Sequence, residues 1–482
     1  MKPLNTQFYK KLVSPLTNGC WMLVLLLLSG CKNFVEVAPP KNSITSESVY
    51  TSDETAASVL TGIYTRFNGD IAGGINGMSI RCGLSADELS LFSGSVNQDL
   101  VGQYRNDISS QSNNSFWEYL YNYILVTNSA IEGIQQSSTL SSTAKNQLLG
   151  ESYFLRSFCY FYLVNLYGGV PIVTTPDFSV NAVEPRASVT DVYDLITSDL
   201  IHAQEYLSED YKSANAKDNT TERIRPNKDA ALAMLARTKL YVKSYAEAEA
   251  FASQVIENKR LYDIETLDNT FLKSSREAIW QLQPTNIGWN TEDARIFILT
   301  QSGLSDLTPV YLNNSFISTV KSDDLRYLSW VNSITLSSND LYYFPFKYKI
   351  GTYDSPLNEY LMVLRLSEQY LIRSEARVMQ GNIDGAKADL NVIRNRANLP
   401  DTEANDKENL LNAILEERRI ELFTEWGHRW LDLKRTETIN DVMGTESANK
   451  GSNWNSNMAL FPIPLADIQR NPSLRNAQNP GY

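Results

Sequence analysis

The sequence predicts an all-α protein: a tetratricopeptide-like α-α superhelical scaffold of about four helix pairs that carries an irregular, loop-rich ligand-binding subdomain. Long amphipathic stretches recur along the chain, several of them as helix, Gly or Ser turn, helix. Alanines gather where two helices of a pair would approach closely, in units of about 34 residues that are similar to tetratricopeptide repeats. A generic helical bundle is the alternative to a repeat scaffold.

The first 30 residues have the pattern of a lipoprotein signal peptide. Three lysines precede the apolar run WMLVLLLL (residues 21–28), which is shorter than the roughly 20 residues that a membrane-spanning helix needs. Two small residues then lead to Cys31, and this LSGC sequence resembles a bacterial lipobox. We therefore predict cleavage before Cys31, lipid attachment to its thiol, and a polar tether over residues 31–48.

Charge argues against several classes of partner. The formal net charge is −12, and cleavage would remove three lysines and no acids, which makes it −15. Such an acidic surface repels phosphate groups, so we expect neither nucleic-acid binding nor electrostatic membrane binding. The lipid alone would then hold the protein on a membrane.

No cofactor or metal site is expected. The chain has only two histidines, His202 and His428, and no HExxH or CxxC motif. Beyond Cys31 only Cys82 and Cys159 remain, and Cys159 lies on an apolar helix face where a free buried thiol is common. We expect both to be free thiols.

The predicted helices fall into two regions. In the N-terminal region, residues 49–260, the first helix begins at Ser52 and Asp53 and has apolar residues at i, i+3, i+4 spacing. In the C-terminal region, residues 261–482, a helical repeat covers residues 359–426. The expected helices are 51–67, 115–134, 145–168, 189–207, 227–244, 245–259, 359–381, 382–400 and 408–426.

Two tracts are expected to be irregular. Residues 261–358 are rich in aromatics, Gly and Asn, and alternation in LYYFPFKYKI (residues 341–350) predicts a strand or two. Residues 67–107 have the same character. Long loops on a rigid helical frame tend to carry binding groups, so we expect the ligand site there.

The stretch ERRIELFTEWGHRWLDLKR (residues 417–435) looks at first like an active site. Glu417, Glu421 and Glu425 follow one another at i, i+4 on one helix, however, with arginines between them, a pattern typical of solvated faces or interhelical ion pairs. A glycosidase needs two carboxylates that face each other across a cleft, one with a raised pKa. No GxSxG motif accompanies His428.

We therefore interpret this stretch as scaffold and predict no catalytic residue. Gly427 is expected to end the helix, and HRWLDLKR to alternate so that Trp430 and Leu433 turn inward. Trp117 and Trp426 are expected to serve helix packing.

The stretches EERRIELFTEWGHRWLDLKRT (residues 416–436) and LFPIPLADIQRNPSLRNAQNPGY (residues 460–482) resemble the SusD/RagB family of Bacteroidetes outer-membrane lipoproteins. The lipobox and the segments FWEYLYNYILVTNSAIE, ESYFLRSFCYFYLVNLYGGVPIV, ALAMLARTKLYV and LRLSEQYLIRSEARVMQGNIDGAKADLNVIRNRA agree, in family order. The resemblance implies four tetratricopeptide-like units, a variable loop-built binding face, and a non-catalytic lipoprotein that captures a nutrient, usually a glycan, for a SusC-like TonB-dependent transporter.

The family resemblance supplies no ligand residues, so these are predicted from chemistry. Sugars present flat C–H faces that stack on aromatic rings, and hydroxyl rims that bind amides, carboxylates and guanidinium groups. Aromatic residues in loops beside such groups are the candidates, although each can equally be a packing residue. The candidate residues are Trp289, Trp330, Tyr311, Tyr104, Phe92, Asp87, Asn97 and Arg105.

Three further hypotheses remain open. RagB-like capture of peptides is the first, and an acidic surface would suit cationic peptides. A surface glycoside hydrolase is the second, against which stands the absence of paired carboxylates near the aromatic loops. A helical-repeat adaptor that binds only other proteins is the third. The protein is expected at the outer membrane, facing the cell surface, although Glu36 is the only acid just after Cys31.

Overall fold

The computed structural model describes residues 49–111 and 116–482, and Val49–Tyr482 forms one compact unit. The predicted signal peptide, the lipid site at Cys31 and the tether lie outside the described residues. Within the described ranges no helix is both long and apolar enough to cross a bilayer. Cys82 and Cys159 are buried free thiols, which confirms that prediction.

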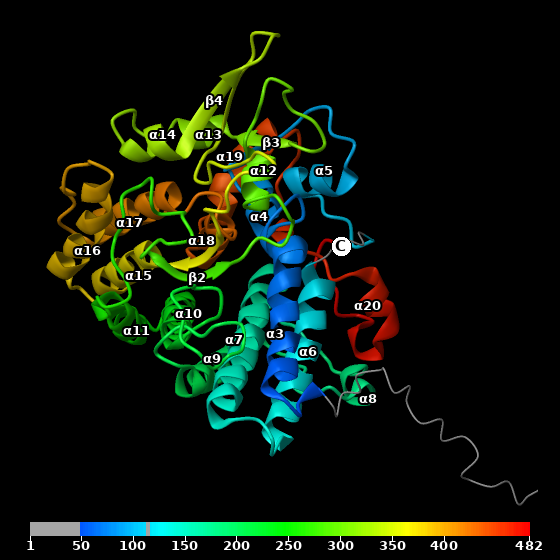
Figure 1. The fold of residues 1–482 in the computed structure, drawn as a ribbon. Helices are drawn as coiled ribbons and strands as arrows, with labels where there is room; N and C mark the ends of the chain where they lie inside the picture. Colours follow the sequence, from blue (N-terminus) through cyan, green and yellow to red (C-terminus); the bar gives the residue numbers. More distant parts are fainter. Residues whose placement is uncertain (1–48, 112–115) are drawn as a thin grey trace, which may run out of the picture. The chain divides into compact units, whose positions relative to one another are not determined.

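The helical scaffold is confirmed. Successive long helices pack against one another from α6 to α17, so that the chain winds through antiparallel pairs (Figure 1). Most of them bury one face, as amphipathic helices do, whereas α7 and α10 are buried on nearly all sides. These helices are α3 (Asp53–Phe67), α6 (Phe116–Gln136), α7 (Ser142–Tyr167), α9 (Val189–Tyr206), α10 (Lys228–Tyr241), α11 (Tyr245–Glu257), α15 (Leu366–Met379), α16 (Ile383–Arg396) and α17 (Lys407–Glu421).

Local sequence explains the helix starts and the close packing. Ser188 and Asp191 form a reciprocal capping box at the start of α9, and Asn227 caps α10. The alanines of α10 are buried, as are Ala248 and Ala252 of α11. Small side chains here let the backbones of the two helices approach closely.

The tract 67–107 is more regular than expected. It contains a π-helical turn (Asn68–Ala72), α4 (Met78–Ser85), β1 (Leu89–Leu91) and α5 (Gln98–Arg105). Every residue of α4 is buried, so tertiary packing stabilises a helix whose short, Gly-flanked sequence predicts none. The prediction of an irregular segment was wrong there.

Residues 261–358 carry short elements between loops. Strands pair as three two-stranded antiparallel sheets: β1 with β3, β2 with β6, and β4 with β5. The strand expected within residues 341–350 is β5. The elements are β2 (Ala278–Leu282), α12 (Glu292–Phe297), β3 (Val310–Leu312), α13 (Asn314–Ile317), α14 (Leu325–Trp330), β4 (Val331–Thr335), β5 (Leu341–Pro345) and, just beyond, β6 (Leu361–Arg365).

The C-terminal part differs from the prediction in several places. Residues 361–365 of the expected helix 359–381 form the strand β6, and α17 ends at Glu421, before the expected end at residue 426. HRWLDLKR forms the helix α18 (His428–Arg435), not an alternating segment, and Gly427 precedes it with a left-handed backbone, φ 73°. Trp430 and Leu433 are nevertheless buried, as predicted. Four elements follow α18: α19 (Ile439–Asn449), a 3-10 turn (Ser456–Ala459), α20 (Leu465–Arg470) and a second 3-10 turn (Pro472–Leu474). One short helix, α8 (Phe178–Asn181), precedes α9.

Candidate ligand-binding site

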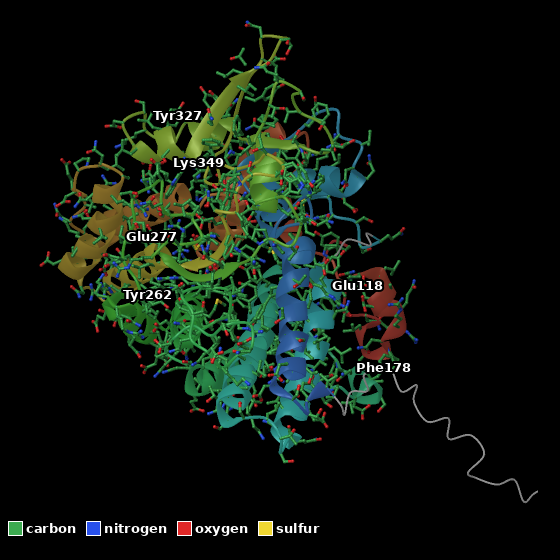
Figure 2. All side chains as sticks on the ribbon, in the orientation of Figure 1. Glu118, Phe178, Tyr262, Glu277, Tyr327 and Lys349 are labelled. Carbon is green, nitrogen blue, oxygen red and sulfur yellow. The ribbon has the colours of Figure 1, made fainter. Side chains whose placement is uncertain are left out.

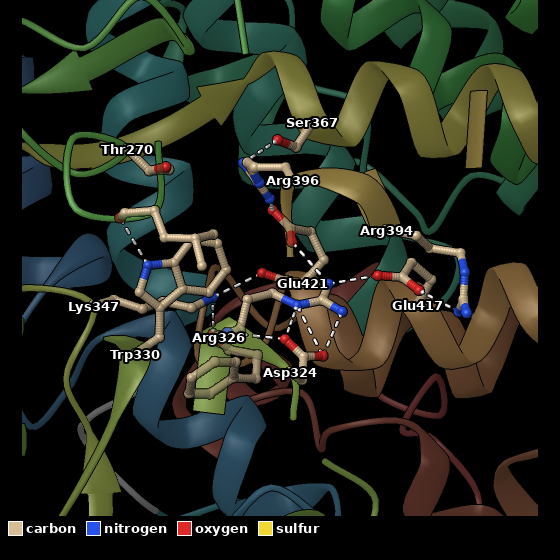
Figure 3. Close-up of polar contacts among 12 residues, drawn as sticks. Thr270, Asp324, Arg326, Trp330, Lys347, Ser367, Arg394, Arg396, Glu417 and Glu421 are labelled. Atoms are coloured by element: carbon tan, nitrogen blue, oxygen red, sulfur yellow. Dashed lines mark hydrogen bonds and ion pairs between the residues drawn. The ribbon is translucent and has the colours of Figure 1, made fainter. Parts of the chain in front are cut away.

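The charged motif at residues 417–435 forms a buried ion network (Figure 3). The carboxylate of Glu421 contacts the guanidinium groups of Arg365 at 2.5 Å and Arg326 at 3.0 Å, and that of Arg396. Burial alone would raise the pKa of Glu421, but Arg396, Arg365 and Arg326 outweigh it and hold that pKa well below its usual range. The glutamates therefore do not form a solvated row. Their carboxylates are buried and form ion pairs with arginine side chains inside the fold.

The same network reaches the segments that carry loops. Lys347 donates hydrogen bonds to the carboxylate of Glu425 at 2.5 Å and to the carbonyl oxygens of Glu421 and Phe423. Arg326 belongs to α14, where it also pairs with Asp324 at 2.7 Å. The motif is thus a framework that fixes the variable tract onto α17.

Asp87, a predicted ligand residue, belongs to this framework. Its carboxylate binds Arg419 at 2.7 Å and Arg429 at 2.7 and 2.8 Å. Burial would raise the pKa of Asp87, but hydrogen bonding to Arg429 and the two guanidinium charges lower it. The prediction that Asp87 contacts a ligand is wrong, because its side chain is enclosed and already paired.

Trp330 is also a packing residue. Its side chain has 0% exposure, and its indole N–H donates to the carbonyl oxygen of Leu267 at 3.0 Å. The ammonium of Lys347 lies 5.0 Å from its ring centroid. No face of the ring is open to a sugar, so this prediction was wrong as well. Trp117 and Trp426 are buried, as predicted.

Two predicted residues, Tyr104 and Tyr311, come together. Tyr311 on β3 lies opposite Ser90 on β1 in the strand register, and Tyr104 projects from α5. Burial raises the pKa of both phenols, while hydrogen bonding with Ser90 lowers both. Ser90 therefore lies close to both tyrosine side chains, although Tyr104 is 14 residues away in sequence and Tyr311 is much farther.

Tyr342 of β5 completes a surface that we call the tyrosine platform (Ser90, Tyr104, Tyr311 and Tyr342). Its ring meets that of Tyr311 edge to face, with 5.0 Å between centroids. All three tyrosines are half-buried, so their packing fixes them while part of each ring stays accessible. In Figure 1 the strand β3 and helix α5 lie in the upper part of the view.

A buried lysine, Lys450, joins the C-terminus of α4 to the ring of Tyr104 in the platform. The ammonium of Lys450 binds the carbonyl oxygens of Leu84 at 2.6 Å and Ser85 at 3.1 Å, and that of Ala86, at the C-terminus of α4. It also lies 5.3 Å from the ring centroid of Tyr104. Burial lowers the pKa of Lys450 to about 7, although the negative charges of Glu446 and Asp87 raise it.

Trp289 belongs to a second aromatic surface. Its ring meets that of Tyr353 edge to face at 5.5 Å, and the guanidinium of Arg295 lies 5.9 Å from its centroid. Tyr353 is 64% exposed and packs over Gly288, whose φ of +82° and close contact with the ring suit only glycine. Trp289, Tyr353 and Arg295 together form this second aromatic surface.

The remaining candidates, Asn97, Phe92 and Arg105, differ in role and in exposure to solvent. Asn97 caps α5 by accepting hydrogen bonds from the N–H groups of Asp99 and Leu100, so its role is structural. Phe92 is half-buried against Gly94 beside the platform strand β1. Arg105 is exposed at the end of α5. Sequence reasoning missed Ser90, Tyr342, Tyr353 and Lys450; only the two tyrosines, within aromatic loop runs, carried a signal.

A groove without exposed aromatic rings lies elsewhere on the variable tract. It has a volume of about 670 Å³ and runs between residues 264–268 and α14, where Leu325 and Leu328 are exposed. Lys349, labelled in Figure 2 near Tyr327, lines it and pairs with Asp268 at 3.5 Å. Within the described ranges, no group of three or more His, Cys, Asp or Glu side chains is arranged to hold a metal ion.

Fold and site together define a helical-repeat scaffold that presents aromatic surfaces on a loop-built face. The family model described as "Starch-binding associating with outer membrane" matches residues 33–240, and the SusD family model matches residues 326–482. The chain belongs to the SusD/RagB family.

Individual relatives agree with the family assignment. The chain is 25% identical over 443 residues to SusD-like protein P38 of Formosa agariphila, covering 80% of this chain and 83% of that protein. It is similar in fold to a SusD superfamily protein from Bacteroides vulgatus, with TM-score 0.76 and 20% identity, covering 89% of this chain and 99% of that one. A laminarin-binding SusD-like protein gives TM-score 0.73 at 22% identity, covering 90% and 100%.

Proposed function

We propose that this protein is a non-catalytic lipoprotein of the outer-membrane surface that captures a glycan and passes it to a SusC-like TonB-dependent transporter. The observation that carries the proposal is the tyrosine platform. Three half-buried tyrosine rings, two of them beside Ser90, offer aromatic faces on which the C–H faces of a sugar can stack. Their hydroxyl groups lie next to these faces, so the surface matches the alternating apolar and polar faces of a sugar chain.

Family membership supports both partner and location. The matching family model is described as starch-binding and associated with the outer membrane, and one solved relative is named for laminarin binding. The LSGC sequence ending at Cys31 supplies the expected lipid site. Transfer to a transporter explains why a binding protein would be anchored at the membrane.

Enclosure of the carboxyl groups that could act as general acids supports the non-catalytic part of the proposal. Glu88 and Asp293 have the raised pKa that a general acid needs, about 8 for each, caused first by burial. Both side chains are buried, however. The cavity beside Asp293 measures about 10 Å³, room for a water molecule but not for a sugar ring.

Peptide capture is the second candidate, and the net charge favours it. A mature charge of −15 would attract cationic peptides. Arg295, which lies over Trp289, is already paired with Glu292. Its positive charge therefore does not make the surface around Trp289 selective for anionic ligands over cationic peptides.

Isothermal titration of the protein from Lys32 onward tests the two candidates. Plant, host and microbial polysaccharides form one panel, and a mixture of cationic peptides forms the other. We expect saturable binding of at least one glycan without release of reducing ends. Binding of peptides alone would favour the second candidate, and released reducing ends would overturn the non-catalytic assignment.

A further inference from the structure

An exposed apolar patch projects from the short helix α8 and the turn that follows it. The side chain of Phe178 is 82% exposed, that of Val180 43% and that of Val183 53%. Among the exposed large hydrophobic residues of the described chain, Phe178 is the only phenylalanine. Single exposed apolar residues are normal, whereas a cluster of them marks contact with a partner or a membrane. We call Phe178, Val180 and Val183 the α8 patch.

The backbone at the end of the patch has hydrogen-bond partners within the protein. From the C-terminal segment, the hydroxyl group of Ser473 donates to the carbonyl oxygen of Val183 at 2.7 Å. The side-chain amide of Asn471 donates to the carbonyl oxygen of Glu184 at 2.8 Å. Transfer of the patch into an apolar medium would therefore bury its side chains without leaving these two carbonyl groups unsatisfied.

The patch lies close to the place where the described chain begins. The ring of Tyr50 packs against Gly133 of α6. Asn128, five residues earlier on α6, donates to the carbonyl oxygen of Thr175 at 3.3 Å, and the same oxygen accepts from Asn181 of α8 at 2.8 Å. Five residues of an α-helix span about 7.5 Å, so Tyr50 and α8 are held by neighbouring turns of one helix.

The figures show the same arrangement. Figure 1 draws α8 beside the lower ends of α3 and α6, and Figure 2 labels Phe178 at that end of the molecule. The strand β3 and helix α5, which carry Tyr311 and Tyr104 of the tyrosine platform, lie toward the other end of the view. The α8 patch and the platform therefore belong to different ends of the fold.

The place where the chain enters the fold indicates what covers the patch. Residues 31–48, which are 18 residues long, separate the predicted lipid site at Cys31 from Val49. A chain of that length spans at most about 60 Å, so the lipid keeps Val49 within that distance of the membrane. Because α8 and the start of the described chain contact the same helix, α8 lies on the side from which the anchored segment comes.

Charge does not drive this contact. Asp177, which precedes Phe178, and Arg475, which follows Ser473, are both exposed and have opposite signs. A contact with lipid would therefore depend on burial of the apolar side chains, and aromatic rings favour the interface between headgroups and hydrocarbon. This agrees with the expectation that the acidic protein has no electrostatic affinity for membranes.

We propose that the α8 patch inserts into the lipid surface to which Cys31 anchors the protein. The proposal rests on the proposed function, through its lipid anchor, and adds a second contact with the membrane. Two contacts fix an orientation that one lipid alone does not. With Phe178 in the bilayer surface, the tyrosine platform is directed away from it, where a long glycan has access.

A fluorescent probe beside Phe178 tests the insertion. Ser179→Cys, an exposed position, is labelled with an environment-sensitive maleimide. Cys82 and Cys159 are buried, and burial raises the pKa of both thiols, so they react slowly. The lipidated protein, with the lipid verified by mass spectrometry, is incorporated into phosphatidylcholine vesicles. We expect a blue shift of the emission and quenching by bromine atoms on the acyl chains.

The control probe is placed at Thr285→Cys. Thr285 is exposed and lies two residues before Ile287, which is 92% exposed, so it also has an apolar neighbour. It precedes α12, which Figure 1 draws far from α8. This probe should show neither shift nor quenching. Added salt should leave the shift at position 179 unchanged, because the contact is apolar.

Acidic substitutions provide the matched variants. Phe178→Asp together with Val183→Asp should abolish the shift of the probe at position 179, because a carboxylate resists transfer from water. Val242→Asp together with Leu328→Asp adds the same charge at apolar residues that are 41% and 67% exposed, and should preserve the shift. No shift at position 179 in vesicles of lipid alone, an equal shift at position 285, or a shift that survives Phe178→Asp with Val183→Asp would overturn the proposal.

Glycan titration of the same variants separates this proposal from the proposed function. Phe178→Asp with Val183→Asp should leave the glycan affinity of the lipid-free protein unchanged, because α8 and the platform lie at different ends of the fold. Glycan binding without insertion of the probe would retain the proposed function and refute the membrane contact. Insertion of the probe in a protein that binds no glycan would retain the membrane contact and refute glycan capture.

Discussion

The carboxylate of Asp87 accepts two hydrogen bonds from the guanidinium group of Arg429, of 2.7 and 2.8 Å. Asp87 begins the segment that continues into β1 and Ser90, whereas Arg429 belongs to the charged motif of α18. One buried contact thus ties the tyrosine platform to the helical framework. The motif that resembles an active site in sequence instead orients the segment that carries the binding surface.

Asp87→Ala is expected to destabilise the protein by about 3 kcal/mol, because it leaves two largely buried guanidinium groups, those of Arg419 and Arg429, without their carboxylate. Urea unfolding measures this cost. Glu437→Ala is the control: it breaks the exposed pair with Lys243 and should cost no more than about 1 kcal/mol. A stable Asp87 variant with lost ligand affinity would instead restore Asp87 as a ligand contact.

Trp330→Ala is expected to cost about 3–5 kcal/mol, because it opens a cavity in the core and leaves the carbonyl of Leu267 without its donor. Trp289→Ala should cost less, since that ring is only half-buried. Thermal unfolding of the two variants compares them. Similar small shifts for both would show that Trp330 is not a packing residue.

Stability should fall with rising pH through the titration of Glu88. Burial raises the pKa of Glu88 from 4.5 to about 8, so between these values the folded state binds more protons than the unfolded state. Its contribution is full below pH 4.5 and is lost as pH rises through 8. Asp293 has the same sign, so the informative quantity is a difference between proteins.

Glu88→Gln should therefore flatten the decline of unfolding free energy between pH 5 and 8 relative to the parent protein. Denaturant titrations at several pH values give that slope. Parallel curves for the two proteins would mean that Glu88 is ionised in the folded state.

The scaffold could be predicted because its signals are local. Helical periodicity, caps and alanine-rich pairs belong to single segments, and α9, α10 and α11 appear where the sequence places them. The short helix α4 could not be predicted, because neighbours that surround it on all sides stabilise it. Propensity carries no information about such tertiary burial.

The site could be predicted only in part for a similar reason. Tyr104 and Tyr311 stand out as aromatics beside Asn and Arg, but nothing in sequence separates them from Trp330, whose surroundings are equally polar. The difference lies in long-range contacts: Trp330 is covered by Leu267 and Lys347, whereas the tyrosines meet at Ser90. Lys450 is invisible in sequence because its partners are backbone carbonyl groups.

The most direct test of glycan capture on the platform compares the binding of one long neutral glycan, chosen from the panel, by the parent protein, Tyr311→Ala and Tyr206→Ala. Tyr206 lies on α9, away from the platform, and controls for loss of a half-buried tyrosine. Loss of one stacking ring, at roughly 1–3 kcal/mol by analogy with base stacking, should weaken binding by about tenfold or more in the Tyr311 variant alone. Equal affinity of all three proteins would contradict the assignment of the ligand to the tyrosine platform.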